Sequence, residues 1–180
     1  NDIIKIGTFG FGGENKIIQE ICKLVCEEFR NINKQVDLNF HITEAFYSEK
    51  CFDKIKNLCL LNITSDNIKL NITNEFLTDE QVLHFLFSND LNIFLYEYYD
   101  FYNGISSSID YALSVKKPIA ICKSNMFSHI MDVNPSICIE NNSLTNIISN
   151  GFSPLEGKYN SWTNENFIQN IETIINQIKK

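Results

Sequence analysis

The stretch of sequence most suited to binding chemistry is residues 103–108, Asn-Gly-Ile-Ser-Ser-Ser. It follows an apolar, strand-like segment and precedes a helical pattern, so its backbone N–H groups would open a helix. Such N–H groups have no intrahelical partner, and the helix dipole adds partial positive charge there. Gly104 allows a ligand close to the backbone, and serine hydroxyls add donors. The pattern predicts a phosphate site, with a simple helix cap as the alternative. The predicted binding residues are Asn103, Gly104, Ile105, Ser106 and Ser107.

A second glycine-rich turn, Gly10-Phe11-Gly12-Gly13, directly follows the first predicted strand. Its glycines Gly12 and Gly13 would let the backbone approach a diphosphate or an acceptor. The spacing matches neither the dinucleotide-binding G-x-G-x-x-G pattern nor a phosphate loop that ends in Gly-Lys-Ser/Thr. An ordinary tight turn between a strand and a helix explains the glycines equally well, and both interpretations stay open.

Strand-like and helix-like segments alternate along the chain. The expected strands are residues 3–9, 36–42, 67–72, 92–96 and 118–122, with a short sixth strand at 136–139. The expected helices are residues 14–31, 52–61, 78–90, 106–115, 143–149 and 163–179. The pattern predicts an α/β fold: one Rossmann-like, doubly wound parallel sheet of about six strands with helices on both faces. Residues 1–180 would form a single domain, and residues 150–160, which contain Pro154 and Gly157, a surface loop.

The composition argues against several classes of function. The 180 residues carry a formal charge of −7 and one arginine, Arg30, which is unfavourable for binding nucleic acid. The apolar runs are much shorter than the roughly 20 residues that span a bilayer. Six cysteines are scattered without metal-ligand spacing, which predicts free thiols in a reducing cytoplasm and no metal site. Because the sequence begins at Asn1 and not at methionine, we expect a fragment of a longer protein.

The order of these elements resembles the C-terminal half of a GT-B glycosyltransferase, and most closely the retaining group known as family 4 or glycosyltransferases group 1. The resemblance covers nearly the whole chain. It rests on the glycine loop after the first strand, the Gly-x-Ser turn at Gly104, an Ala-Leu helix and the strand that begins at Pro118. In that family this half binds the nucleotide diphosphate sugar, and the N-terminal half mainly binds the acceptor. The resemblance implies transfer of a sugar to a glycan, lipid or protein, without a cofactor or metal.

The family's Glu-x7-Glu motif assigns roles to individual residues. Gly104 takes the place of the motif glycine, and Asp110 that of the second acid, which usually holds the ribose. Asn103 stands near the place of the first acid, so the catalytic residues stay unknown. Lys16 is the basic candidate for the diphosphate, and Phe76 for an apolar wall beside the base. The ordinary alternatives are a solvated helix residue for Asp110 and a core side chain for Phe76.

Two other interpretations stay open. The missing first acid and the scarcity of arginine favour a GT-B-like module that has lost catalysis and serves as a binding or scaffolding unit. A different Rossmann-like domain, such as a flavodoxin- or receiver-like protein, is a third possibility, although Thr8-Phe9-Gly10 lacks the acids of a receiver. If the chain is the donor-binding half of a glycosyltransferase, its expected partners are a nucleotide-sugar donor and an absent N-terminal acceptor-binding domain. Nucleic acid is not an expected partner. Peripheral membrane association of the full enzyme is left open, and the fragment alone would transfer nothing.

Overall fold

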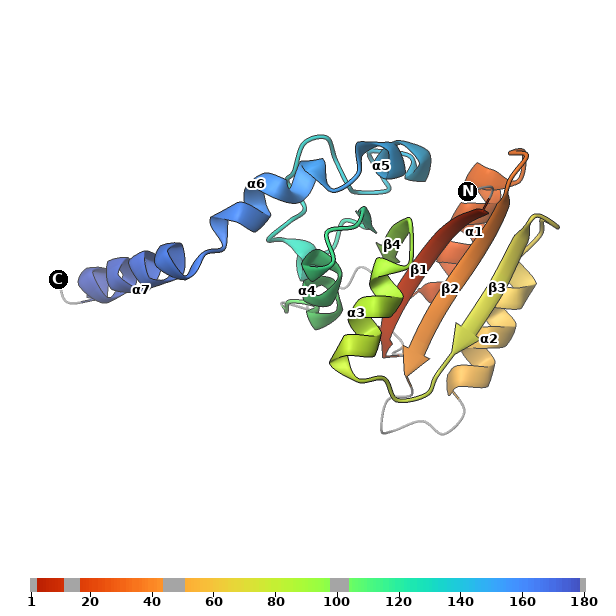
Figure 1. Ribbon diagram of the computed structural model, residues 1–180, viewed down its shortest axis with the longest axis horizontal. Coiled ribbons are helices and arrows are strands. Elements are labelled where there is room, and N and C mark those ends of the chain that lie inside the picture. Colours follow the sequence, from red (N-terminus) through yellow and green to blue (C-terminus); the bar gives the residue numbers. More distant parts are fainter. Residues whose placement is uncertain (1–2, 12–16, 44–50, 98–103, 179–180) are drawn as a thin grey trace.

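The computed structural model describes residues 3–11, 17–43, 51–97 and 104–178 (Figure 1). The strands in this part of the chain are β1 (Ile3–Phe11), β2 (Gln35–Thr43), β3 (Ile68–Thr73), β4 (Leu91–Phe94) and β5 (Ile119–Ile121). The helices are α1 (Ile18–Phe29), α2 (Cys51–Asn62), α3 (Asp79–Phe87), α4 (Ser107–Ser114), α5 (Leu144–Asn150), α6 (Ser153–Ser161) and α7 (Asn164–Ile178). A short 3-10 helix, η1 (Asn125–Phe127), follows β5. Strands and helices alternate as the sequence pattern predicts.

The strands form a parallel sheet in the order β3-β2-β1-β4-β5. Ile6 of β1 aligns with Leu38 of β2 on one side and with Leu91 of β4 on the other. Strands β2 and β3 are added in turn on one side of β1, and β4 and β5 are added on its other side. The direction in which successive strands are added therefore reverses between β1 and β4. This is the Rossmann order, and it differs from the order 2-1-3-4-5 of flavodoxin and receiver domains. The topology therefore excludes a flavodoxin- or receiver-like domain. In sheets of this order ligands bind beyond the carboxyl ends of the strands where the order reverses, so we expect the ligand crevice beyond β1 and β4.

Helices cover both faces of the sheet, as the sequence predicts. Helices α1 and α2 pack together on one face, whereas α3 and α4 pack together on the other (Figure 1). In β2 the side chains of Val36, Leu38, Phe40 and Ile42 are buried toward the first face. The alternate positions are polar because α3 and α4 leave part of the second face open. The capping box predicted at Thr78 opens α3, with both of its hydrogen bonds formed.

A chain of asparagine side chains crosses the sheet. Asn71 donates to Asn39 (3.0 Å), Asn39 donates to Asn89 (3.1 Å), and Asn89 donates to Asn92 (3.0 Å). Asn89 and Asn92 are completely buried, so these bonds satisfy amides that would otherwise be costly to remove from water. Gly7 of β1 lies where this row of asparagine side chains passes over the central strand. A side chain at position 7 would overlap Asn89.

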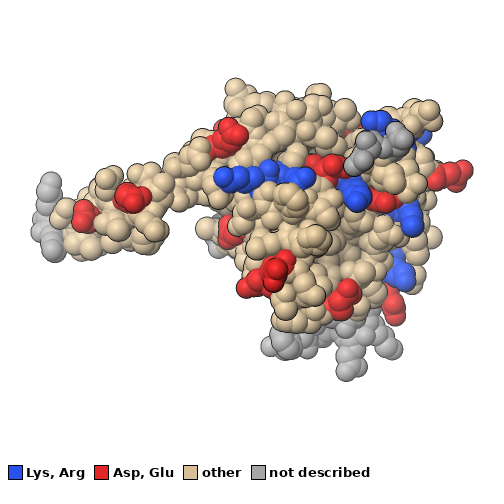
Figure 2. All heavy atoms as spheres, in the orientation of Figure 1, with Lys and Arg blue, Asp and Glu red and all other residues tan. Residues whose placement is uncertain are grey.

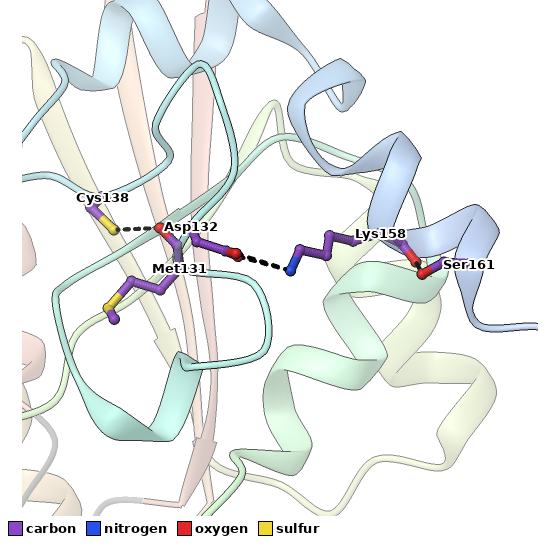
Figure 3. A network of polar contacts seen from close by, with 5 residues as sticks. All are labelled: Met131, Asp132, Cys138, Lys158 and Ser161. Carbon is purple, nitrogen blue, oxygen red and sulfur yellow. Dashed lines mark hydrogen bonds and ion pairs between the residues drawn. The ribbon is translucent and has the colours of Figure 1, made fainter. Parts of the chain in front are cut away.

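Two details of the predicted secondary structure are wrong. The sheet of the described residues has five strands, because the predicted sixth strand contributes a single bridge between Cys138 and Ile121. Residues 153–160 of the predicted surface loop lie in helix α6. Pro154 lies in the first turn of α6, where its missing N–H costs nothing. Lys158 of α6 binds Asp132 (Nζ–Oδ1 2.9 Å), which ties the helix to the segment after β5 (Figure 3).

The terminal helix α7 extends away from the body of the protein (Figure 1). The predicted amphipathic pattern is present, and none of its residues is buried against the described chain. Its exposed apolar side chains are Phe167, Ile168, Ile171, Ile174, Ile175 and Ile178. On the face drawn in Figure 2, lysines and carboxylates are interspersed and do not form one basic surface. Among the described helices, none combines the length and apolar character needed to cross a membrane.

Candidate functional site

The predicted phosphate site lies where β4 gives way to α4, on one side of the crevice. Ser106 is the N-cap of α4 and is buried. Its hydroxyl is hydrogen-bonded to the hydroxyl of Tyr96 (2.8 Å), and its backbone N–H donates to the carbonyl of Met126 (3.4 Å). The hydroxyl and the backbone N–H of Ser106 therefore each have a partner inside the protein. Ser106 fixes the start of α4 and is a positioning residue here.

The groups free to meet a ligand belong to the neighbours of Ser106. Gly104 and Ser107 are exposed, and the side chain of Ile105 is 65% exposed. Ser107 is the first residue of α4, so its backbone N–H has no intrahelical acceptor. A Cβ at Gly104 would stand 3.3 Å from the sulfur of Met126, so any side chain at this position requires Met126 to shift by a few tenths of an ångström. The turn thus presents an open helix N-terminus, as predicted.

Asp110 faces a different part of the surface. It is exposed in the first turn of α4 and lines a hollow of about 390 Å³ together with Tyr159 and Trp162. None of residues 104–107 lines this hollow. Asp110 nevertheless lies three residues after Ser107 on α4, within reach of the exposed turn, and a ribose contact for this side chain stays a prediction.

The remaining predicted residues fall into two groups. Phe76, in the segment after β3, is 87% exposed and is not a core side chain. Its neighbours Glu75 and Leu77 line a groove on the open face of the sheet. Four of the predicted residues lie outside the described part of the chain: Gly12, Gly13, Lys16 and Asn103.

Two residues behind the turn were missed by sequence reasoning. Tyr96 is buried, and burial raises the pKa of its phenol, although the bond to Ser106 partly opposes this. The sulfur of Cys122 accepts from the backbone N–H of Tyr96 (3.1 Å) and donates to its carbonyl (3.3 Å). These contacts join the segments that follow β4 and β5. The only sequence signal was the position of both residues at the ends of predicted strands, 92–96 and 118–122.

His129, which follows β5, has a half-buried ring against Trp162 (centroids 5.9 Å apart). Both ring nitrogens are buried without a hydrogen-bond partner in the described structure. Burial lowers the pKa of His129 below its ordinary value of 6.5, and Lys158 lowers it further, while Asp110 opposes the shift. Burial also lowers the pKa of His41, against the influence of Glu75. Protonation of either ring therefore favours the unfolded chain.

This predicts a loss of stability in mild acid. The contribution of neutral His129 is complete above the unfolded pKa of 6.5 and is lost as the pH falls below it. We expect the free energy of unfolding to decrease between about pH 7 and pH 5, and the decrease to be smaller in His129→Gln. Urea unfolding at a series of pH values measures this. An identical pH dependence in the variant and the parent would contradict the assignment to His129, since His41 alone would account for it.

Comparisons with solved structures identify the fold. A Candida albicans trehalose-6-phosphate phosphatase N-terminal domain superposes with a TM-score of 0.64 at 13% identity, over 94% of this chain and 42% of that chain. An E. coli structure described as trehalose-6-phosphate bound with UDP-2-fluoro glucose gives 0.61 at 4% identity, over 88% and 39%. The chain has the fold of one half of a GT-B glycosyltransferase.

A third structure extends the comparison to another enzyme. The catalytic domain of a Helicobacter pylori cholesterol-α-glucosyltransferase superposes with a TM-score of 0.53 at 15% identity, over 96% of this chain and 99% of that chain. The GT-B half described here spans about two fifths of the first two structures. No protein-family model and no curated protein sequence matches the chain. The predicted fold class is confirmed, and the likeness at these identities concerns the fold.

Proposed function

We propose that this chain is the donor-binding half of a glycosyltransferase, which moves a sugar from a nucleotide diphosphate sugar to an acceptor. The observation that carries the proposal is the exposed N-terminus of α4 at the reversal point of a GT-B half. Gly104 and Ser107 there offer open backbone and an unbonded N–H to a phosphate. The bound UDP-2-fluoro glucose of the E. coli structure supports a nucleotide-sugar ligand for this fold.

The chemistry would be mainly electrostatic. The departing diphosphate carries negative charge, and the helix N-terminus stabilises that charge without rearrangement. Lys16 would add a positive charge from the loop after β1. An N-terminal domain would bring the acceptor, so we expect the chain alone to bind nucleotide and transfer nothing. We further propose a retaining reaction in the cytoplasm.

A nucleotide titration tests the proposal. The ¹⁵N-labelled chain is titrated with UDP, GDP and ADP and with their glucose conjugates, and amide shifts are followed by NMR. We expect saturable shifts for one base, centred on the N–H groups of Ser107 and Ser108. Shifts centred elsewhere, or none at millimolar ligand, would contradict donor binding by this chain.

The second candidate is a GT-B-like module without catalysis. The buried hydroxyl of Ser106 favours it, because this predicted ligand group already has a partner, Tyr96, inside the protein. The two candidates differ in an assay of the chain with an N-terminal partner half. Hydrolysis or transfer of the bound donor sugar supports the enzyme, whereas nucleotide binding without turnover supports the binding module.

A further inference from the structure

A groove lined by both polar and apolar side chains lies on the open face of the sheet, and among the described residues that line it none belongs to α4. Its floor is formed by the outward positions of β2 and β3, and its wall by α3. We call it the sheet-face groove; its volume is about 610 Å³. The groove exists because α1 and α2 cover the opposite face of β2 and β3, while α3 packs beside β1. It contains polar side chains on both strands, including Asn39, His41, Asn71 and Thr73.

The floor of the groove is rigid. Asn71 and Asn39 form the outer end of the asparagine chain whose inner end, Asn89 and Asn92, is completely buried. His41 is also fixed, because Thr73 bonds its Nδ1 (2.8 Å). Side chains held in one geometry lose little conformational entropy when a ligand binds.

The groove retains unused hydrogen-bonding groups. A carboxamide has two N–H donors and an oxygen with two acceptor sites. In the described structure Asn71 uses one N–H, and no donor reaches its oxygen. The oxygen of Gln81 caps α3 by accepting from the N–H of Thr78 (2.9 Å), which leaves its NH₂ group for a ligand. His84, one turn further along α3, adds an exposed imidazole.

The charges of the groove restrict its ligand. Glu75 and Glu80 line it, and its described lining contains neither lysine nor arginine. A phosphate or carboxylate would be repelled, whereas hydroxyl groups can donate to the carboxylates and to the amide oxygens. Adjacent donors and acceptors on rigid amides suit the neighbouring hydroxyls of a sugar ring. The half-buried ring of Phe85 supplies an apolar surface beside them.

We propose that the sheet-face groove binds a neutral saccharide, at a second site separate from the N-terminus of α4. This inference goes beyond the donor site and does not depend on it. The two sites differ in chemistry, since the helix N-terminus attracts an anion and the groove excludes one.

The test is an NMR titration of the labelled chain with maltotriose, cellotriose and triacetylchitotriose. Side-chain NH₂ signals of Asn39, Asn71 and Gln81 report directly on the groove. We expect saturable shifts of these signals with at least one trisaccharide. If no groove signal shifts at about 10 mM trisaccharide, a concentration tenfold above a millimolar dissociation constant, the proposal is overturned.

Variants test whether a saccharide binds in the groove or elsewhere on the surface. Loss of one hydrogen-bonding side chain, in Asn71→Leu or His84→Ala, should weaken saccharide binding by about three- to tenfold. Asn146→Leu, an exposed asparagine in α5, is the matched control and should bind as the parent does. His84→Ala changes an exposed helix position, so it keeps the test valid if Asn71→Leu does not fold. Equal affinity of the parent and His84→Ala, with groove signals unmoved, would contradict the assignment.

Discussion

Gly7→Ala is expected to destabilise the protein by about 3 kcal/mol or more. A Cβ at Gly7 would overlap the side-chain nitrogen of Asn89, which is completely buried. Asn89 cannot move aside freely, because it bonds Asn39, Asn92 and the carbonyl of Phe85. The variant must either strain β1 or leave buried amides without partners, and both are costly. Urea unfolding followed by circular dichroism measures the loss.

Two further variants test the cause of this loss. Gly157→Ala in α6 is the matched control, because its Cβ would meet no atom within 4 Å. It should stabilise the protein by about 0.5–1 kcal/mol, since alanine is the better helix former. In an Asn89→Ala background the overlapping nitrogen is gone, so Gly7→Ala should cost much less than in the parent. An equal cost in both backgrounds would show that the asparagine chain is not what excludes a side chain at Gly7.

The sequence predicted the alternation of elements well, because buried parallel strands and amphipathic helices have clear patterns. It did not predict the role of Gly7, although a glycine inside a strand can mark a close approach of another group. Asn89 and Asn92 follow one another closely after α3, but their partners Asn39 and Asn71 come from two other strands. Only the folded sheet brings these four amides together.

Helix α6 was missed for a different reason. Pro154 and Gly157 are usually signs of a loop, and the local pattern there is weakly amphipathic. Tertiary contacts decide the conformation instead. Leu155 is buried in the core, and Lys158 binds Asp132 from the segment after β5. Such contacts join distant parts of the chain and have no local sequence signal.

At the candidate site the sequence predicted an exposed turn before a helix. It did not predict which serine side chains are buried and which are exposed. Three serines in a row look equivalent as donors. In the structure Ser106 is buried and bonded to Tyr96, whereas Ser107 is exposed. Which hydroxyl faces inward depends on where the helix begins, and that is uncertain by a residue or two from sequence. The backbone N–H of Ser107 therefore becomes the group to test.

Ser107→Pro should weaken nucleotide binding by about ten- to 150-fold, the cost of one hydrogen bond to a charged group. Proline removes the N–H and is accepted at the first position of a helix. The preceding residue must be extended, and Ser106 already is, with φ −79° and ψ 111°. The substitution thus deletes one donor while α4 is expected to keep its conformation, which circular dichroism checks. Affinity is measured by calorimetry with UDP, GDP and ADP.

Ser107→Ala is the control that separates the backbone from the side chain. It keeps the N–H and removes only the hydroxyl, so we expect a loss of about tenfold at most, the range for a neutral hydrogen bond. A much larger loss in Ser107→Pro than in Ser107→Ala would assign phosphate binding to the helix N-terminus. An equal loss of nucleotide affinity in both variants would assign phosphate binding to the Ser107 hydroxyl. Unchanged binding in the proline variant would mean that the phosphate lies elsewhere in the crevice, because a phosphate seated on α4 must accept from its first free N–H group.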